Sequence, residues 1–262
     1  MNFTFGIIYF KNFFLINEII KSIENENIPN YEIIIVGNYP IHNDNIMVIP
    51  FNETEIPNCI TKKKNIITEK AKYDNIVFLH DYIKLNKDWY EGFLKFGNDW
   101  EVCMCKIFTN DGQRGIDWMG LPNDNIYGNV LHPYDYCNQK GMYIPGNFWV
   151  AKKDIMVKYK LDEKLCWGQA EDIEWSKRIL GGYYDSDWLR NLCHIPLNTD
   201  MEMKNREVPD KIRYKMNQYS SVSYLKHKPT PIDFYKKFDC HSGDNSRPKN
   251  YNKEDYLYLK YR

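Results

Sequence analysis

The stretch Tyr31-Glu-Ile-Ile-Ile-Val-Gly37 decides the predicted fold class. Its apolar run is nearly continuous, which is typical of a strand buried on both faces in a parallel sheet. Short β-branched and aromatic runs on either side predict further strands over residues 3–10, 46–51 and 75–80. Apolar residues at helical spacing predict helices over residues 15–23 and 61–72. This alternation predicts an α/β fold with an open, mostly parallel central sheet flanked by helices.

The remainder of the chain has a looser pattern. It predicts helices over residues 89–96, 153–159, 171–180 and 209–225, and strands over residues 101–108, 143–150 and 188–195. Residues 109–140 are rich in Gly, Asn, Asp and Pro and are expected to form a long functional loop region. We expect one domain over residues 1–228 and a polar, Tyr-rich C-terminal extension over residues 229–262.

Composition narrows the classes of partner. The 262 residues carry 35 basic and 35 acidic side chains, so no general attraction to nucleic acid or acidic lipid is indicated. The 7 cysteines form no CxxC pair and are expected to be reduced thiols rather than zinc ligands. No apolar run approaches the ~20 residues that span a bilayer, and the N-terminus lacks a signal-peptide pattern. We therefore expect a cytoplasmic protein without a membrane span, in the host cytoplasm if the source is a virus.

The first candidate site is Asp81, in the segment Phe78-Leu-His-Asp-Tyr82 at the end of the fourth predicted strand. Ligands of open α/β sheets bind outside the carboxyl ends of the strands. A carboxylate at that position can hold a divalent ion against a diphosphate, and the ion then stabilises the leaving nucleotide. The alternative is an aspartate that only caps a turn.

The second candidate site is the pair Glu171 and Asp172, in the segment Trp167-Gly-Gln-Ala-Glu-Asp172 that opens a predicted helix. A carboxylate at the base of a cleft can deprotonate an acceptor hydroxyl. Acidic residues at a helix start are also favoured by the macrodipole, so helix capping is the alternative. Glu174 lies on the same helical face as Glu171 and is the weaker candidate.

Three further positions complete the candidate site. His194 follows a predicted strand and is a candidate second metal ligand beside Asp81, because imidazole suits Mn²⁺ alongside a carboxylate. A hydrogen-bonded structural histidine is the alternative. Gly146 allows a ligand to approach the backbone closely. Trp149 and Trp167 can stack on the apolar face of a sugar ring, although core packing is the default role of a tryptophan.

The order of these elements resembles the GT-A glycosyltransferases. The first two strands resemble the nucleotide-binding half of family 2-like enzymes, and residues 78–82 lie where that family carries its DxD metal motif. Residues 143–149 and 167–172 are similar to the glycine-rich strand and the WGxxED segment of β-1,4-galactosyltransferase-like enzymes. The resemblance covers roughly residues 3–205, and the WGxxED segment is its most specific part.

The resemblance implies roles for particular residues. Asp172 would be the catalytic base of an inverting transfer, and Glu171 would hold acceptor hydroxyls or share that role. Asp81 and His194 would bind Mn²⁺ or Mg²⁺. The residues implied to lie near the nucleotide or its sugar are Ile7, Tyr9, Asn38, His80, Asp81, Gly146 and Trp167.

We therefore expect a glycosyltransferase, of the hexosyltransferase class, that uses a nucleotide-sugar donor. The resemblance implies a UDP-sugar, and the acceptor is expected to be a hydroxyl on a glycan, a protein or a lipid-linked molecule. The chain has His80 and Tyr82 where a DxD motif has acids, so either His80 or Asp81 takes the metal, or metal use is weakened.

Two alternatives to this enzyme follow from the same segments. The incomplete DxD motif favours a degraded carbohydrate- or nucleotide-sugar-binding protein, whereas the presence of both Glu171 and Asp172 opposes it. A nucleotidyltransferase is disfavoured, because Phe10-Lys-Asn-Phe-Phe-Leu15 supplies no glycine after the first strand.

Overall fold

The computed structural model describes residues 1–10, 12–40, 46–52, 59–120, 130–137, 139, 142–163, 165, 171–180 and 212–226. All of them belong to the first of two compact units, Met1–Lys228. The second unit, Pro229–Arg262, and the predicted strand over residues 188–195 lie outside the described residues. Within the described ranges, no helix has the length and apolar character needed to cross a membrane.

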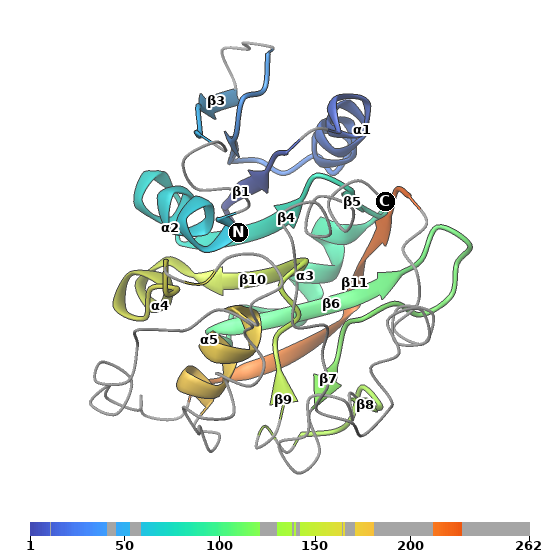
Figure 1. The fold of residues 1–262 in the computed structure, drawn as a ribbon. Helices are drawn as coiled ribbons and strands as arrows, with labels where there is room; N and C mark the ends of the chain where they lie inside the picture. The colour runs from blue at the N-terminus through green and yellow to red at the C-terminus, as the bar shows by residue number, and fades with distance from the viewer. Residues whose placement is uncertain are drawn as a thin grey trace, which may run out of the picture. The chain divides into compact units, whose positions relative to one another are not determined.

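The main sheet has the strand order β3-β2-β1-β4-β10-β6-β11-β5, and Figure 1 shows it as a curled layer. Its first half is parallel throughout, as the continuous apolar runs predict, and consists of β1 (Phe3–Ile8), β2 (Tyr31–Val36), β3 (Ile46–Ile49) and β4 (Asn75–His80). Its second half mixes directions and consists of β5 (Ile83–Leu85), β6 (Val102–Phe108), β10 (Phe148–Lys152) and β11 (Tyr214–Tyr224). There, β10 is antiparallel to β4 and β6, while β11 is parallel to β6 and antiparallel to β5.

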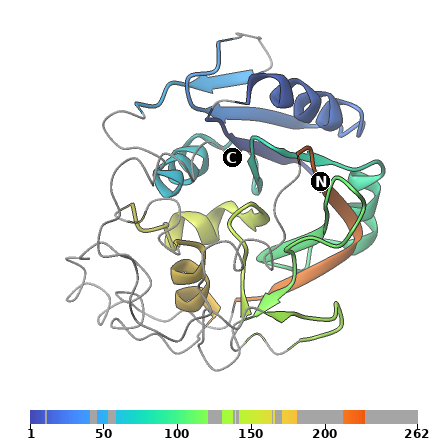
Figure 2. The same ribbon diagram turned by 45° about the vertical axis from the view of Figure 1, so that its right-hand side comes forward.

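Helices cover both faces of the sheet. Alternate residues of β1 point to opposite faces, and both sets of side chains pack against helices. Phe3 and Phe5 face Trp89, with ring centroids 5.1 and 5.6 Å away. Gly6 faces the other side, where an added Cβ would lie 2.3 Å from Ile67. Figure 2 shows α2, α4 and α5 on one side and α3 on the other. The helices of the described residues are α1 (Phe13–Glu24), α2 (Ile60–Lys70), α3 (Trp89–Phe96), α4 (Lys153–Lys158) and α5 (Glu171–Leu180).

The prediction of a helix over residues 209–225 is wrong, because this segment contains strand β11. Its buried side chains include Tyr214, Met216, Val222 and Tyr224, which alternate at the strand period of two within each half. Between the two halves the alternation is interrupted, since Asn217 is buried and Gln218 is exposed where the pairing register with β6 shifts. This irregularity interrupts the alternation that would have revealed a strand.

The predicted loop region between residues 109 and 140 contains part of a small second sheet. Its strands are ordered β8-β7-β9 and are antiparallel, with β7 at Met119–Gly120, β8 at Val130–Leu131 and β9 at Met142–Tyr143. The predicted strand over residues 143–150 is thus divided between β9 and β10, with a turn at Gly146 and Asn147.

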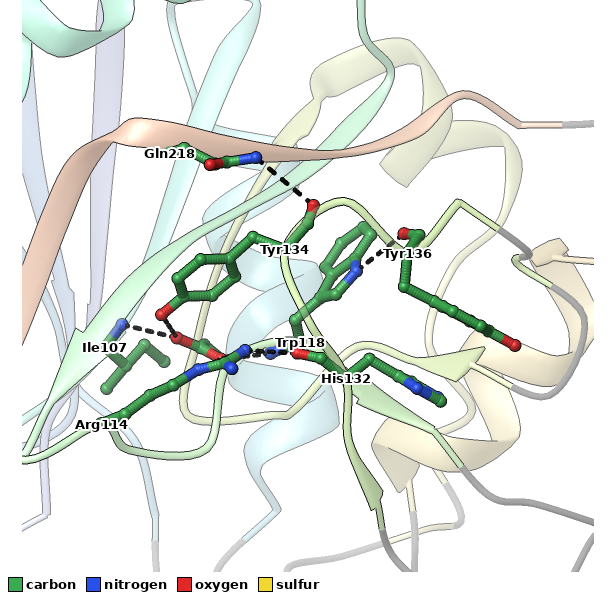
Figure 3. A network of polar contacts seen from close by, with 8 residues as sticks. Ile107, Arg114, Trp118, His132, Tyr134, Tyr136 and Gln218 are labelled. Carbon is green, nitrogen blue, oxygen red and sulfur yellow. Dashed lines mark hydrogen bonds and ion pairs between the residues drawn. The ribbon is translucent and has the colours of Figure 1, made fainter.

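Asp117, two residues before the start of β7, is fully buried and connects this region to β6. Its Oδ1 accepts hydrogen bonds from Arg114 Nε (3.0 Å) and Nη2 (2.8 Å) and from Trp118 N (2.6 Å). Its Oδ2 accepts bonds from Ile107 N (3.2 Å) and the Tyr134 hydroxyl (2.8 Å). Figure 3 shows these donors converging from separate segments, so one carboxylate holds these segments together.

Candidate active site

The carboxyl ends of β1, β2 and β4 meet at one edge of the sheet. Ile8 of β1 is in register with Val36 of β2 and with His80 of β4. Gly37 follows β2 with a φ of +143°, and an added Cβ would lie 2.4 Å from the Tyr9 carbonyl oxygen. Glycine permits both this φ and the close approach, so the segments that follow the strands pass directly beside one another.

Asp81, directly after β4, is 4% exposed and binds the connection between β1 and α1. Its Oδ2 accepts hydrogen bonds from the main-chain N–H groups of Phe10 (3.0 Å) and Asn12 (3.4 Å), and its Oδ1 accepts one from Asn12 Nδ2 (2.9 Å). These contacts correspond to the structural role that the sequence left open as the alternative. They also bring Asp81 to the segment that is expected to lie beside the nucleotide.

A metal ion at this edge would need ligands in addition to Asp81. In the part of the chain that the structure describes, no group of three His, Cys, Asp or Glu side chains is arranged to hold an ion. His80 is buried, and its Nδ1 lies 3.1 Å from the Tyr82 hydroxyl. The second predicted ligand, His194, lies outside the described residues. The Asp81 carboxylate fits Mn²⁺ or Mg²⁺ in ligand type.

The other residues expected near the nucleotide differ in accessibility. Ile7 is fully buried in β1 and is a core residue, so its side chain is not a ligand contact. Tyr9 is also buried, and its ring packs edge-on against Tyr39 at 5.4 Å. Asn38 is exposed, and its Oδ1 accepts a main-chain hydrogen bond at 3.2 Å. Trp167 lies outside the described residues.

Gly146 links the acidic pair to this edge of the sheet. Because β10 is antiparallel to β4, its start lies beside the end of β4, where the His80 N–H donates to the Asn147 carbonyl at 3.2 Å. The N–H of the adjacent Gly146 donates to Asp172 Oδ2 at 2.9 Å. Asp172 and Asp81 therefore belong to segments that the structure brings to the same sheet edge.

The buried Tyr82 hydroxyl experiences the charges of both acidic segments. Burial is the main reason that the pKa of Tyr82 is raised well above its usual value, and Tyr224, Asp81 and Glu171 raise it further. Asp81 and Glu171 therefore both act on this one phenol.

Glu171 and Asp172 open α5 and pack directly against Gly146. Glu171 is buried, whereas Asp172 is partly exposed. The Asp172 Oδ1 accepts a hydrogen bond from Ile173 N at 2.9 Å, as expected for an acid in the first turn of a helix. A Cβ on Gly146 would lie 3.1 Å from Glu171 Oε1 and 3.2 Å from Asp172 Oδ2. Residue 146 is therefore a glycine where both carboxylates approach the backbone.

Lys64 of α2 is a site residue that the sequence interpretation missed. Its side chain is fully buried, and its Nζ donates to the Gly146 carbonyl at 2.8 Å. The Nζ also lies 4.5 Å from the ring centroid of Trp149, which is itself a core residue. The signal was a lysine on the inner helical stripe that includes Ile60 and Ile67, both buried. Because a lysine in a helix is normally exposed to solvent, its position in the sequence does not by itself indicate a buried site residue.

Lys63, the neighbour of Lys64, is buried in the same way. Its Nζ donates to the Tyr9 carbonyl at 2.8 Å and lies 5.0 Å from the ring centroid of Phe51. Successive lysines of α2 therefore bind the two halves of the candidate site. Lys63 holds the segment after β1, and Lys64 holds the turn beside the acidic pair.

Burial and mutual repulsion set the protonation of the acidic pair. Burial and, to a smaller extent, the charge of Asp172 raise the pKa of Glu171, Lys64 opposes both effects, and the resulting pKa is about 8. Burial also raises the pKa of Asp172, opposed by the Gly146 N–H and by Lys64. Burial lowers the pKa of Lys64, opposed by the two carboxylates. Near neutral pH, Glu171 is therefore mainly protonated.

A Glu171→Gln variant is expected to lose part of the pH dependence of stability. The pKa of Glu171 is about 8 in the folded protein and ordinarily 4.5. The folded state therefore binds more protons than the unfolded state between these values, so stability falls as pH rises through this window. The slope is at most ~1.4 kcal/mol per pH unit. Glutamine does not ionise, so the variant should show a shallower decline in urea-unfolding experiments across this range.

Glu69→Gln is the matched control for that measurement. Glu69 lies on α2 and is exposed, with its carboxylate 2.9 Å from the exposed Lys160. This variant should keep the wild-type slope. Parallel stability curves for wild type and Glu171→Gln would contradict the raised pKa of Glu171.

Comparison with known proteins finds similarity in structure but not in sequence. No protein-family model and no curated protein sequence matches this chain. Among solved structures, GalNAc-T7 with UDP, GalNAc and Mn²⁺ matches with a TM-score of 0.57 at 12% identity, over 87% of this chain and 43% of that one. TarS of S. aureus matches with a TM-score of 0.51 at 12% identity, over 91% of this chain and 38% of that one.

The chain has a GT-A fold. The likeness extends over most of this chain, at 87% and 91%. The chain corresponds to less than half the length of either solved structure, at 43% and 38%. At 12% identity the likeness establishes the fold alone.

Proposed function

We propose that this GT-A chain is a glycosyltransferase that moves a sugar from a nucleotide-diphosphate donor to a hydroxyl acceptor with inversion. The observation that carries the proposal is the Lys64–Gly146–Asp172 arrangement, with Gly146 N–H on the Asp172 carboxylate and Lys64 Nζ on the Gly146 carbonyl. It lies at the sheet edge where open α/β sheets bind their ligands. The catalytic domain would be residues 1–228, with residues 229–262 as an extension.

The donor side of the proposed site lies beyond β1, β2 and β4. Tyr9 and Asn38 would flank the nucleotide, and Asp81 holds the backbone of Phe10 and Asn12 next to it. Trp167 would contact the sugar. A UDP-sugar is the proposed donor, and the solved structure of GalNAc-T7 contains UDP and GalNAc.

A divalent ion would be held by Asp81 and His194, with Mn²⁺ or Mg²⁺ as the candidates. Bound there, it would neutralise the diphosphate of the donor. His80, next to Asp81, would contribute to the donor side rather than to the acceptor side.

The acceptor side of the proposed site is the acidic pair. Asp172 would take the proton from the acceptor hydroxyl, because it is partly exposed and is oriented by Gly146 N–H and Ile173 N–H. The hydroxyl oxygen would then attack the anomeric carbon opposite the nucleotide. Glu171, mainly protonated near neutral pH, would hold an acceptor hydroxyl by hydrogen bonding.

A second candidate function is a nucleotide-sugar-binding protein without transfer activity. The hydrogen bonds that Asp81 makes to Phe10 and Asn12 favour it, because they give this carboxylate a structural role independent of any ion. Hydrolysis of UDP-sugars with Mn²⁺ separates the two candidates. An enzyme would release free sugar slowly, and a binding protein would release none.

Thermal shift with UDP, GDP and their sugars, each with and without Mn²⁺, tests the proposed function. A ligand that binds only the folded state stabilises it by about 2.7 kcal/mol at a hundredfold excess over Kd. For a domain of this size that corresponds to a rise in Tm of several degrees, on the order of 5 °C. We expect the largest rise with UDP and Mn²⁺ together. No rise with any nucleotide would contradict both candidate functions.

A further inference from the structure

Lys64 and Asp172 bind opposite polar groups of the same residue. The Gly146 carbonyl accepts a hydrogen bond from Lys64 Nζ at 2.8 Å, and the Gly146 N–H donates to Asp172 Oδ2 at 2.9 Å. Both carboxylates also pack closely against this residue, because an added Cβ would lie 3.1 Å from Glu171 Oε1 and 3.2 Å from Asp172 Oδ2. A displacement of the lysine is therefore transmitted to the Asp172 carboxylate through one residue.

We propose that Lys64 is the positioning residue of the acidic pair, which orients Asp172 through Gly146 and keeps it ionised for acceptor activation. This inference rests on the proposed function and extends it to a residue of a different element, α2. Lys64 itself touches neither donor nor acceptor. It acts through Gly146 and through its charge.

The location of Lys64 supports this role. A lysine in a fully buried position is costly unless its charge and its hydrogen-bonding capacity are matched. The inner stripe of α2 otherwise holds the apolar Ile60 and Ile67. The Lys64 ammonium lies over the Trp149 ring at 4.5 Å, an arrangement favourable to a cation. The site is thus built to retain a positive charge beside two carboxylates.

Among the described residues, the ionisable groups that interact with the pair come from three parts of the chain. Glu171 and Asp172 belong to α5, Lys64 belongs to α2 with Cys59 just before it, and Tyr82 follows β4. In the part of the chain that the structure describes, Lys64 is the positive charge that lowers the pKa of both carboxylates. Without it, Glu171 and Asp172 would face each other uncompensated, and both would hold their protons to higher pH.

The Lys64→Met variant tests the proposal, because methionine fills a similar volume without charge or N–H donor. We expect kcat at neutral pH to fall by roughly tenfold or more, with little change in the KM for the donor. The acidic limb of the pH–rate profile should move to higher pH. Lys62→Met, two residues earlier on α2 and half-exposed, is the control and should keep the wild-type profile.

Carboxyl NMR gives a readout that does not depend on transfer. In Lys64→Met, the titration midpoints of Glu171 and Asp172 should both be higher than in wild type. Unchanged midpoints, or an unchanged pH–rate profile in an active variant, would overturn the proposal. Wild-type protein without transfer at any pH would refute the proposed function instead, and the NMR comparison would still decide the role of Lys64.

A second measurement applies if Lys64→Met does not fold. The Lys64 Cε signal of the wild type should follow the ionisation of Glu171, with a midpoint near its pKa of about 8. The Glu171→Gln variant keeps Lys64 and should lose that transition. A Lys64 signal that does not change from about pH 6 to about pH 9 would overturn the proposal.

Discussion

Asp172→Asn is expected to reduce sugar transfer by roughly 100- to 10,000-fold while leaving donor binding intact. Asparagine has the same shape, and its side-chain oxygen can still accept the hydrogen bond that Gly146 N–H donates to Asp172 at 2.9 Å. It cannot accept a proton from an acceptor hydroxyl. Steady-state transfer rates, together with donor affinity measured by calorimetry, check both parts of the expectation.

Asp154→Asn is the matched control for this substitution. Asp154 lies in the first turn of α4, is exposed, and accepts a hydrogen bond from the next main-chain N–H at 2.8 Å, as Asp172 does in α5 at 2.9 Å. The control should keep full activity. Loss of nucleotide binding in a folded Asp172→Asn protein would count against the assignment of Asp172 as base.

Asp117→Ala is expected to destabilise the fold by about 3–5 kcal/mol. The substitution removes one fully buried carboxylate and leaves four donor residues without their acceptor, Ile107, Arg114, Trp118 and Tyr134. The Arg114 guanidinium is the most affected, since it is only partly exposed and would lose both of its bonds to Asp117. The midpoint and slope of urea unfolding measure the loss.

Asp99→Ala provides the comparison for a surface carboxylate. Asp99 is 72% exposed, and its partners Arg213 and Lys215 are also accessible to solvent. Exposed ion pairs contribute little to stability, so this variant should unfold close to wild type. If Asp117→Ala lost no more stability than Asp99→Ala, the organising role of Asp117 would be refuted.

The parallel half of the GT-A sheet was predictable because its signal is local. Residues 33–36 and 76–79 are uninterrupted apolar runs, and runs this short are typical of strands buried on both faces. The helix Glu171–Leu180 was predicted with its observed bounds, because acidic residues at its start and an apolar inner stripe agree.

The strand Tyr214–Tyr224 was not predictable in the same way. Its partners, Val102–Phe108 and Ile83–Leu85, lie more than a hundred residues earlier in the chain, so the hydrogen bonds that define it have no local signature. Its register shift at Asn217 and Ser221 also breaks the alternation that marks a strand.

The candidate site was predictable to the extent that its residues are unusual in sequence. Adjacent acids at a helix start, and an aspartate after a buried strand, draw attention by themselves. Lys64 does not, because its role follows from the packing of α2 against the turn at Gly146, which depends on the tertiary fold. Ile7 is the opposite case. It was expected near the nucleotide from its position in the sequence, and its side chain is fully buried in the core.

The insertion of β11 between β6 and β5 has a consequence for synthesis on the ribosome. A nascent chain that has emerged as far as α5 already contains both flanking strands, yet the strand that joins them is still missing. Until residues 214–224 arrive, β6 and β5 present unpaired backbone edges. The growing polypeptide is therefore most prone to self-association late in translation, and chaperone protection matters most in that interval.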